Sequence, residues 1–419
     1  MGIDSSVRKL NIMLLTNVVL LLMVFGLFTI DNRAVLNLAS VAMVLLSLYT
    51  IRSEKINIIK AIGNFFKNRK SLAIFSLWCL ICIVFFTYKN NTAGAVGQFF
   101  KDWRYPIIML VFFIAFHKHI LQLKKTYVIS AIITLAYIVL VVPVLRYIKN
   151  DPQALYLQLR YGFAFYVVML YPFVLAGGLM YKNILIKISL LSLSFLAFIF
   201  LLYTGSRGGI LSLAVETVAV MFLCTKNIKK FLLVIFMSLA VAGIGVAIAY
   251  NSFSQVKNKI EQSTQVTNIS SGRDQIITQR YPLVMNSIKN AIFGIGYGNS
   301  TYDEYLWDHQ APRNNLVFNF NTNKYNLDEP LFFTILYNIG FGGLALFLVS
   351  MFVNIKEMIK SVRAKRDIFS ISLLTSFIGY FLVYCLFEKM FMEIYLLYTI
   401  MALVFINKKG QQDNMETID

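Results

Sequence analysis

Residues 11–30 read NIMLLTNVVLLLMVFGLFTI, a run without any acidic or basic side chain. An α-helix needs about 20 apolar residues to cross the hydrocarbon core of a bilayer. Similar runs recur along the chain, for example at 231–250. The chain has 419 residues, of which 58% are hydrophobic and only 14% charged, and a mean hydropathy of +0.68. This composition excludes a soluble globular protein and predicts an all-α polytopic membrane protein.

We predict about twelve membrane-spanning helices from the positions of these apolar runs. They cover residues 11–30, 34–51, 71–88, 104–119, 127–147, 161–180, 185–203, 209–226, 231–251, 330–354, 368–387 and 393–407. The predicted organisation is helices 1 to 9 within 1–251, a long loop at 252–329, helices 10 to 12 within 330–407, and a tail at 408–419.

The net charge of +19 raises the question of a nucleic-acid partner, so the positions of the 39 Lys and Arg residues matter. Many of them lie at the termini and in alternate inter-helix loops, at 52–70, 118–125, 182–187, 226–230 and 356–366. This alternation is the positive-inside pattern of membrane proteins. It predicts cytoplasmic N- and C-termini, a periplasmic loop at 252–329, and membrane lipids rather than nucleic acid as partners.

The long loop is predicted to be a folded cap. It contains a helix-like stretch at 274–292, followed by the turn-rich GIGYGN at 294–299. Its aromatic residues suit either sugar stacking or contact with the lipid interface. These aromatic residues are Tyr302, Tyr305, Trp307, Phe318, Phe320 and Tyr325.

The four cysteines lie inside apolar runs, which is typical of thiols that serve as small hydrophobic side chains. The three histidines are not accompanied by the cysteine or carboxylate partners of a metal site. We therefore expect neither a disulfide framework nor a metal or other cofactor.

Arg207 lies in YTGSRGG at 203–209, between two predicted spans on the periplasmic side. An ionisable residue near membrane depth is a functional hypothesis by default, and a guanidinium at a helix N-terminus suits a diphosphate. The alternative is an arginine that reaches lipid headgroups, with Ser206 as the helix cap. Arg160 and Arg273 lie on the same predicted side, where basic residues are scarce. The three together favour an anionic ligand over surface ion pairs.

Asp328-Glu329-Pro330 ends the loop immediately before the tenth predicted span. A carboxylate there suits a general base that removes the proton from an attacking sugar hydroxyl. The alternative is ordinary helix N-terminal chemistry, because acidic residues beside an early proline are common at helix starts.

Three segments resemble elements of O-antigen ligases and the related O-antigen polymerases. SRGG at 206–209 resembles their Ser-Arg-Gly-Ala element. NAIFGIGYGN at 290–299 is similar to their glycine-rich segment, and NIGFGGL at 338–344 to the helix that follows their loop. The resemblance covers roughly residues 155–400.

The resemblance implies a metal-independent, inverting glycosyltransferase of the inner membrane with a GT-C-like fold. It implies glycan on undecaprenyl diphosphate as donor and lipid A-core oligosaccharide as acceptor. Carried onto this chain, it makes Arg207 and Arg273 the diphosphate contacts, with Arg160 as a third member of the group. The family carries a His-Asn pair just before the post-loop helix, where this chain has Glu329-Pro330. We interpret Glu329 as the catalytic base, since a carboxylate is already ionised at neutral pH.

Two rival functions remain open at this point. An O-antigen polymerase uses the same lipid-linked donor, but its acceptor is a second lipid-linked repeat. A flippase or other transporter of lipid-linked glycan predicts charges in the middle of helices and paired half-helices. The arginines singled out here lie at predicted periplasmic helix ends instead.

Overall fold

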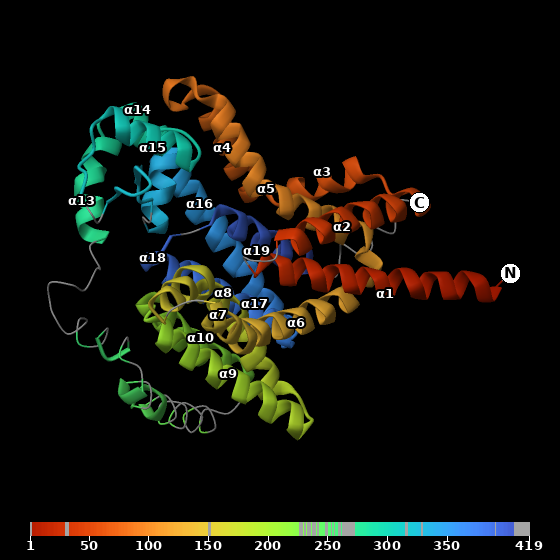
Figure 1. Ribbon diagram of the computed structural model, residues 1–419. Coiled ribbons are helices and arrows are strands. Elements are labelled where there is room, and N and C mark those ends of the chain that lie inside the picture. Colours follow the sequence, from red (N-terminus) through yellow and green to blue (C-terminus); the bar gives the residue numbers. More distant parts are fainter. Residues whose placement is uncertain are drawn as a thin grey trace.

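The computed structural model describes residues 2–29, 33–149, 152–225, 273–314, 317–327, 330–389 and 391–405, together with scattered residues between 229 and 261. The chain forms a bundle of helices with a smaller helical cap at one end (Figure 1). The first half consists of α1 (Gly2–Leu27), α2 (Arg33–Ser53), α3 (Ile58–Asn68), α4 (Lys70–Phe85), η1 (Tyr88–Asn90), α5 (Thr92–Ala115), η2 (His117–His119), α6 (Ile120–Ala136), η3 (Tyr137–Val141), α7 (Val142–Lys149), α8 (Pro152–Met180), α9 (Ile184–Thr204) and α10 (Arg207–Cys224).

The second half contains the cap and the last helices of the bundle. Its elements are α13 (Arg273–Val284), α14 (Ile288–Phe293), α15 (Asn299–Asp308), β1 (Phe318–Asn319), β2 (Lys324–Tyr325), α16 (Leu331–Ala364), α17 (Ile368–Phe377), η5 (Ile378–Tyr384), α18 (Cys385–Phe387) and α19 (Met392–Phe405). The two strands form one short antiparallel pair, and the rest of the described secondary structure is helical. The all-α polytopic class is confirmed.

Seven described helices are long and apolar enough to cross a membrane, and the bent pair 58–67 and 70–85 adds an eighth if it is one span. Every predicted span except 231–251 falls on a helix, and 231–251 lies largely outside the described residues. Some helices fall short of a span by composition or length: α5 carries Lys101, Asp102 and Arg104, and the apolar part of α19 is short. The count of twelve and the GT-C-like fold stay predictions.

Lipid exposure explains the patterning of the outer helices. On α2, Leu38, Leu45 and Leu48 are exposed, whereas Ala39 and Met43 are buried on the opposite face. A helix in a bilayer gains little from burying its outer apolar face, because lipid tails are as apolar as leucine. The centre of the bundle is α8, since 89% of its span at 162–180 is buried inside the protein.

Two contacts join segments near loops that are predicted to be cytoplasmic. Lys118 Nζ lies 3.1 Å from Glu54 Oε2, which joins the loops 118–125 and 52–70. The ammonium of Lys124 lies 5.7 Å from the ring centroid of Phe369, next to the loop 356–366.

The described part of the predicted loop 252–329 forms a cap with its own hydrophobic core. The helix-like stretch 274–292 is two helices, because Ser287 caps α14 by accepting a hydrogen bond from Asn290 N at 3.1 Å. The prediction that all six loop aromatics serve sugar or lipid contact is wrong. Four of them are at most 5% exposed and form the core of the cap: Tyr302, Tyr305, Phe318 and Tyr325.

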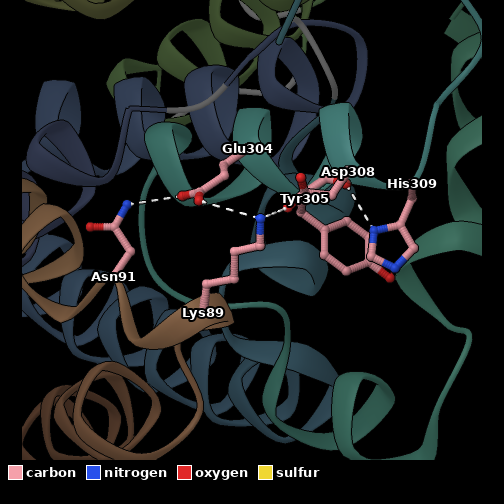
Figure 2. Close-up of polar contacts among 6 residues, drawn as sticks. All are labelled: Lys89, Asn91, Glu304, Tyr305, Asp308 and His309. Atoms are coloured by element: carbon pink, nitrogen blue, oxygen red, sulfur yellow. Dashed lines mark hydrogen bonds and ion pairs between the residues drawn. The ribbon is translucent and has the colours of Figure 1, made fainter.

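The cap is fastened to the loop between α4 and α5 (Figure 2). Lys89 Nζ lies 2.5 Å from Asp308 Oδ2 and 4.0 Å from Glu304 Oε1, and Asn91 Nδ2 donates to Glu304 at 3.2 Å. The Lys89 ammonium holds the pKa of the Asp308 carboxyl below its ordinary value, chiefly through their hydrogen bond. Behind this pair, the Tyr305 ring stacks on His309, with centroids 3.9 Å apart.

Candidate active site

The SRGG element forms a tight junction between α9 and α10. Gly205 ends α9 in the left-handed region, with φ of 57°, which glycine adopts at little cost. Ser206 then caps α10, because its Oγ accepts a hydrogen bond from Gly209 N at 3.2 Å. Arg207 is the first residue of α10 and is half-buried. The predicted cap and the predicted guanidinium at the helix N-terminus are therefore both present.

Gly208 brings the start of α10 close to the end of α18. A Cβ atom on Gly208 would lie 3.3 Å from Phe387 Cβ and 3.6 Å from Glu388 Cγ, so glycine allows close packing here. Lys389 follows Glu388 directly, and its side chain lines a cavity. The SRGG element thus adjoins the segment that forms one wall of that cavity.

The glycine-rich turn at 294–298 forms a second wall. Gly294, Gly296 and Gly298 all have positive φ, at 77°, 134° and 107°. The turn is tied to α16, because Ile295 N donates to Tyr337 O at 2.8 Å and Gly298 N donates to Asn338 Oδ1 at 2.6 Å. These hydrogen bonds fix the backbone on both sides of Tyr297. The segment is a turn, as the sequence predicts for a glycine-rich stretch that lacks the strand and helix of a nucleotide-binding loop.

The helix α16 is interrupted where it meets this turn. Gly340 has φ of 67° and ψ of −172°, which breaks the helix. The freed carbonyl of Ile339 accepts a hydrogen bond from Trp78 Nε1 at 3.0 Å. The ring of Trp78 stacks on Phe293, with centroids 5.2 Å apart. The second and third resemblance segments, 290–299 and 338–344, are therefore packed against each other.

A cavity of about 150 Å³ lies between α5, the turn, the start of α16 and the residues on either side of position 390. Its charged side chains are Lys101 and Asp102 of α5, with Lys389 and Glu393 opposite. Phe391 lines it as well and lies 5.2 Å, centroid to centroid, from Phe165 of α8. Four segments far apart in the sequence meet here, and all of them lie at predicted periplasmic helix ends.

Asp102 is the most constrained of these charged groups. Its Oδ2 accepts a hydrogen bond from Tyr297 Oη at 2.7 Å, and its Oδ1 accepts one from Gln98 Nε2 at 2.8 Å. The residue is 8% exposed. Burial raises the pKa of the Asp102 carboxyl to about 6, while the two hydrogen bonds and Lys101 oppose that rise.

The predicted site residues are only partly placed. Arg207 and Arg160 are both half-buried, and Arg160 lies five residues before Phe165 on α8, which packs against α10. Arg273 begins α13, but its side chain is outside the described residues. Glu329 is also outside them. The grouping of Arg207 with Arg273, and the base at Glu329, stay predictions.

Sequence reasoning missed Asp102, Tyr297, Lys389 and Glu393. A signal for two of them existed: Asp102 lies in the charged cluster at 101–104 on the predicted periplasmic side, and Glu393 opens the last apolar run. Each reads as an ordinary helix-end charge on its own. Among the described residues there is no group of three or more His, Cys, Asp or Glu side chains arranged to hold a metal ion.

Comparison with known proteins agrees with the motif positions. No curated protein matches the sequence. Residues 192–348 match the family model described as O-Antigen ligase. This segment contains the SRGG element, the glycine-rich turn and the break in α16. Residues of the turn and of the start of α16 line the cavity. This match over residues 192–348 supports an O-antigen ligase family assignment.

Proposed function

We propose that this protein is an O-antigen ligase of the bacterial inner membrane. It transfers glycan from undecaprenyl diphosphate to lipid A-core oligosaccharide on the periplasmic face, with inversion and without a metal ion. The observation that carries the proposal is the family match over residues 192–348 together with one polar cavity, which two of the family segments line. The third segment, SRGG, packs against Phe387 and Glu388, next to Lys389 in the cavity wall. A transferase whose donor is anchored in the bilayer needs its reacting groups at such a boundary between helices and cap.

The donor diphosphate binds at the start of α10 in this proposal. The first amides of a helix and a guanidinium fork both favour a phosphate group. Arg207 supplies the fork, and Arg273 and Arg160 add positive charge from α13 and α8. Such interactions are stronger where water is excluded.

The reaction is a single displacement. An acceptor sugar hydroxyl attacks the anomeric carbon, a new glycosidic C–O bond forms, and the bond from that carbon to the diphosphate oxygen breaks. Undecaprenyl diphosphate leaves with the electron pair, and its charge is stabilised by Arg207 and Arg273. Glu329 takes the hydroxyl proton. Attack from the face opposite the leaving group inverts the anomeric configuration.

The test uses purified protein, lipid-linked glycan and lipid A-core, with and without a chelator. We expect transfer in both conditions for the wild type. Glu329→Gln should fold and bind donor, but its transfer should fall about 100-fold or more, because a general base contributes 10²–10⁴-fold. Wild-type lipopolysaccharide ladders from Glu329→Gln would refute its role.

The same assay separates the ligase from the polymerase. Product on lipid A-core supports the ligase, whereas growth of the chain only on a second lipid-linked repeat supports the polymerase. In cells, loss of a ligase leaves polymer on its carrier lipid, and loss of a polymerase leaves core capped with one repeat. Movement of lipid-linked glycan across vesicles without any transfer would support the flippase instead.

A further inference from the structure

The cavity between α5 and the glycine-rich turn has a charge balance that does not suit a diphosphate. Asp102 and Glu393 contribute two carboxyl groups, and Lys101 and Lys389 contribute two ammonium groups. A diphosphate favours an excess of positive charge, and carboxylates so close to it repel it. A neutral ligand meets no such penalty.

The remaining walls are built for hydroxyl groups. Gln98, Asn299 and Thr334 supply neutral donors and acceptors, and Phe391 supplies an aromatic ring for the apolar face of a sugar. About 150 Å³ is far more than a single water or ion requires, since a water occupies about 30 Å³ in the liquid. The size and the mixture of groups fit one sugar ring.

Asp102 is held in place as a hydrogen-bond acceptor. A carboxylate has about four lone-pair sites. Tyr297 and Gln98 each donate to one oxygen, at 2.7 Å and 2.8 Å, which fixes the orientation of the group and leaves acceptor capacity on both oxygens. An acceptor whose geometry is set before binding loses little entropy when a hydroxyl donates to it.

The turn that carries Tyr297 is itself fixed. Asn338 Oδ1 accepts from Gly298 N at 2.6 Å, and Asn338 Nδ2 donates to Thr334 O at 2.8 Å. The amide of Asn338 is therefore engaged in holding the wall. The ligand-facing role falls to Asp102, which Tyr297 and Gln98 position.

We propose that this cavity is a subsite for one neutral sugar ring, with Asp102 accepting hydrogen bonds from its hydroxyl groups. Neither Arg207 nor Arg160 lines this cavity. The assignment of the subsite to a sugar of the transfer reaction rests on the proposed function. Two sources supply such a ring: the first sugars of the donor glycan and the terminal sugars of the acceptor core.

The experiment measures binding to protein in nanodiscs with three probes. These are the neutral oligosaccharide released from the lipid carrier, the dephosphorylated core oligosaccharide, and undecaprenyl diphosphate without sugar. We expect Asp102→Asn to lower the binding affinity for one of the two oligosaccharides roughly 10- to 100-fold, which is the effect of a lost charge-assisted hydrogen bond. The oligosaccharide that is weakened identifies the source. Binding of the sugar-free lipid should stay within twofold.

A second variant and a control guard against misfolding. Tyr297→Phe keeps the Asp102 carboxyl and removes one hydrogen-bond donor that orients it. The affinity for the same oligosaccharide should therefore fall about 3- to 10-fold. Glu54→Gln, at an exposed carboxyl outside both the cap and the cavity, should bind all three probes like the wild type. Unchanged oligosaccharide binding in Asp102→Asn, or weaker binding of the sugar-free lipid, would overturn the subsite.

Transfer kinetics distinguish this proposal from the function. If the wild type binds the oligosaccharide but transfers nothing, the ligase and polymerase proposals fail and the subsite stands. If the wild type transfers glycan, Asp102→Asn should raise KM for the matching substrate about tenfold or more, with a smaller change in kcat. A fall in kcat with unchanged KM would contradict a binding role.

Discussion

Replacing Gly294 with Ala should destabilise the cap. Gly294 has φ of 77° and ψ of −173°, a region almost restricted to glycine, and a side chain there costs about 1–3 kcal/mol. The added Cβ would also lie 2.6 Å from Ile339 N and 2.7 Å from Asn338 C, against 3.4–4 Å for ordinary contact. Backbone atoms cannot rotate away, so overpacking adds about 1–3 kcal/mol. We expect a total of about 2–6 kcal/mol.

Thermal unfolding in detergent measures this effect, with Gly63→Ala as the matched control. A Cβ on Gly63 has nothing within 4 Å, and the residue lies inside the helix α3. Its replacement should be neutral or stabilise by about 0.5–1 kcal/mol, because alanine favours a helix. The reasoning is refuted if Gly294→Ala melts within a degree of the wild type, or if both variants shift alike.

Two further predictions concern buried polar groups. Arg280 is 1% exposed and donates to Val317 O at 2.9 Å and Asn326 O at 2.8 Å, so Arg280→Ala should cost the cap about 3 kcal/mol or more. Trypsin should then cut faster at Arg313 and Lys324, with Arg280→Lys between Ala and the wild type; equal rates for all three would contradict this. The pKa of Asp102 is raised from 3.8 to about 6, so the folded state binds more protons than the unfolded state between those values. Stability should therefore fall as pH rises from about 4 to 6 in the wild type relative to Asp102→Asn, and identical melting profiles would argue against the raised pKa.

The local parts of the site are predictable from the sequence because neighbouring residues determine their backbone conformation. Gly205 and Ser206 mark a helix end and a helix start, and the structure confirms both. The run from Gly294 to Gly298 predicts a turn, since only glycine adopts its backbone angles easily. In these segments each residue constrains its own backbone, so no information about the rest of the fold is required.

The partners across the cavity are not predictable in this way. Asp102 and Tyr297 are 195 positions apart, and nothing in the residues around either one encodes their hydrogen bond. Lone charges at the ends of apolar runs serve membrane topology as often as chemistry. The aromatics of the cap were misread for the same reason: whether Tyr302 faces a ligand or a core depends on packing that the local pattern does not contain.

The break at Gly340 divides α16 into two parts that pack in different places. Phe333, Leu336 and Tyr337 precede it and belong to the hydrophobic core of the cap, whereas the residues after it run down through the bundle. The first turns of this helix are thus part of the cap in structural terms, although in sequence they continue directly into a membrane span. A chimera that exchanges caps between relatives should accordingly be joined at Gly340. A junction at the start of the helix would separate the cap from Phe333 and Tyr337, two of the six buried aromatic residues in its core.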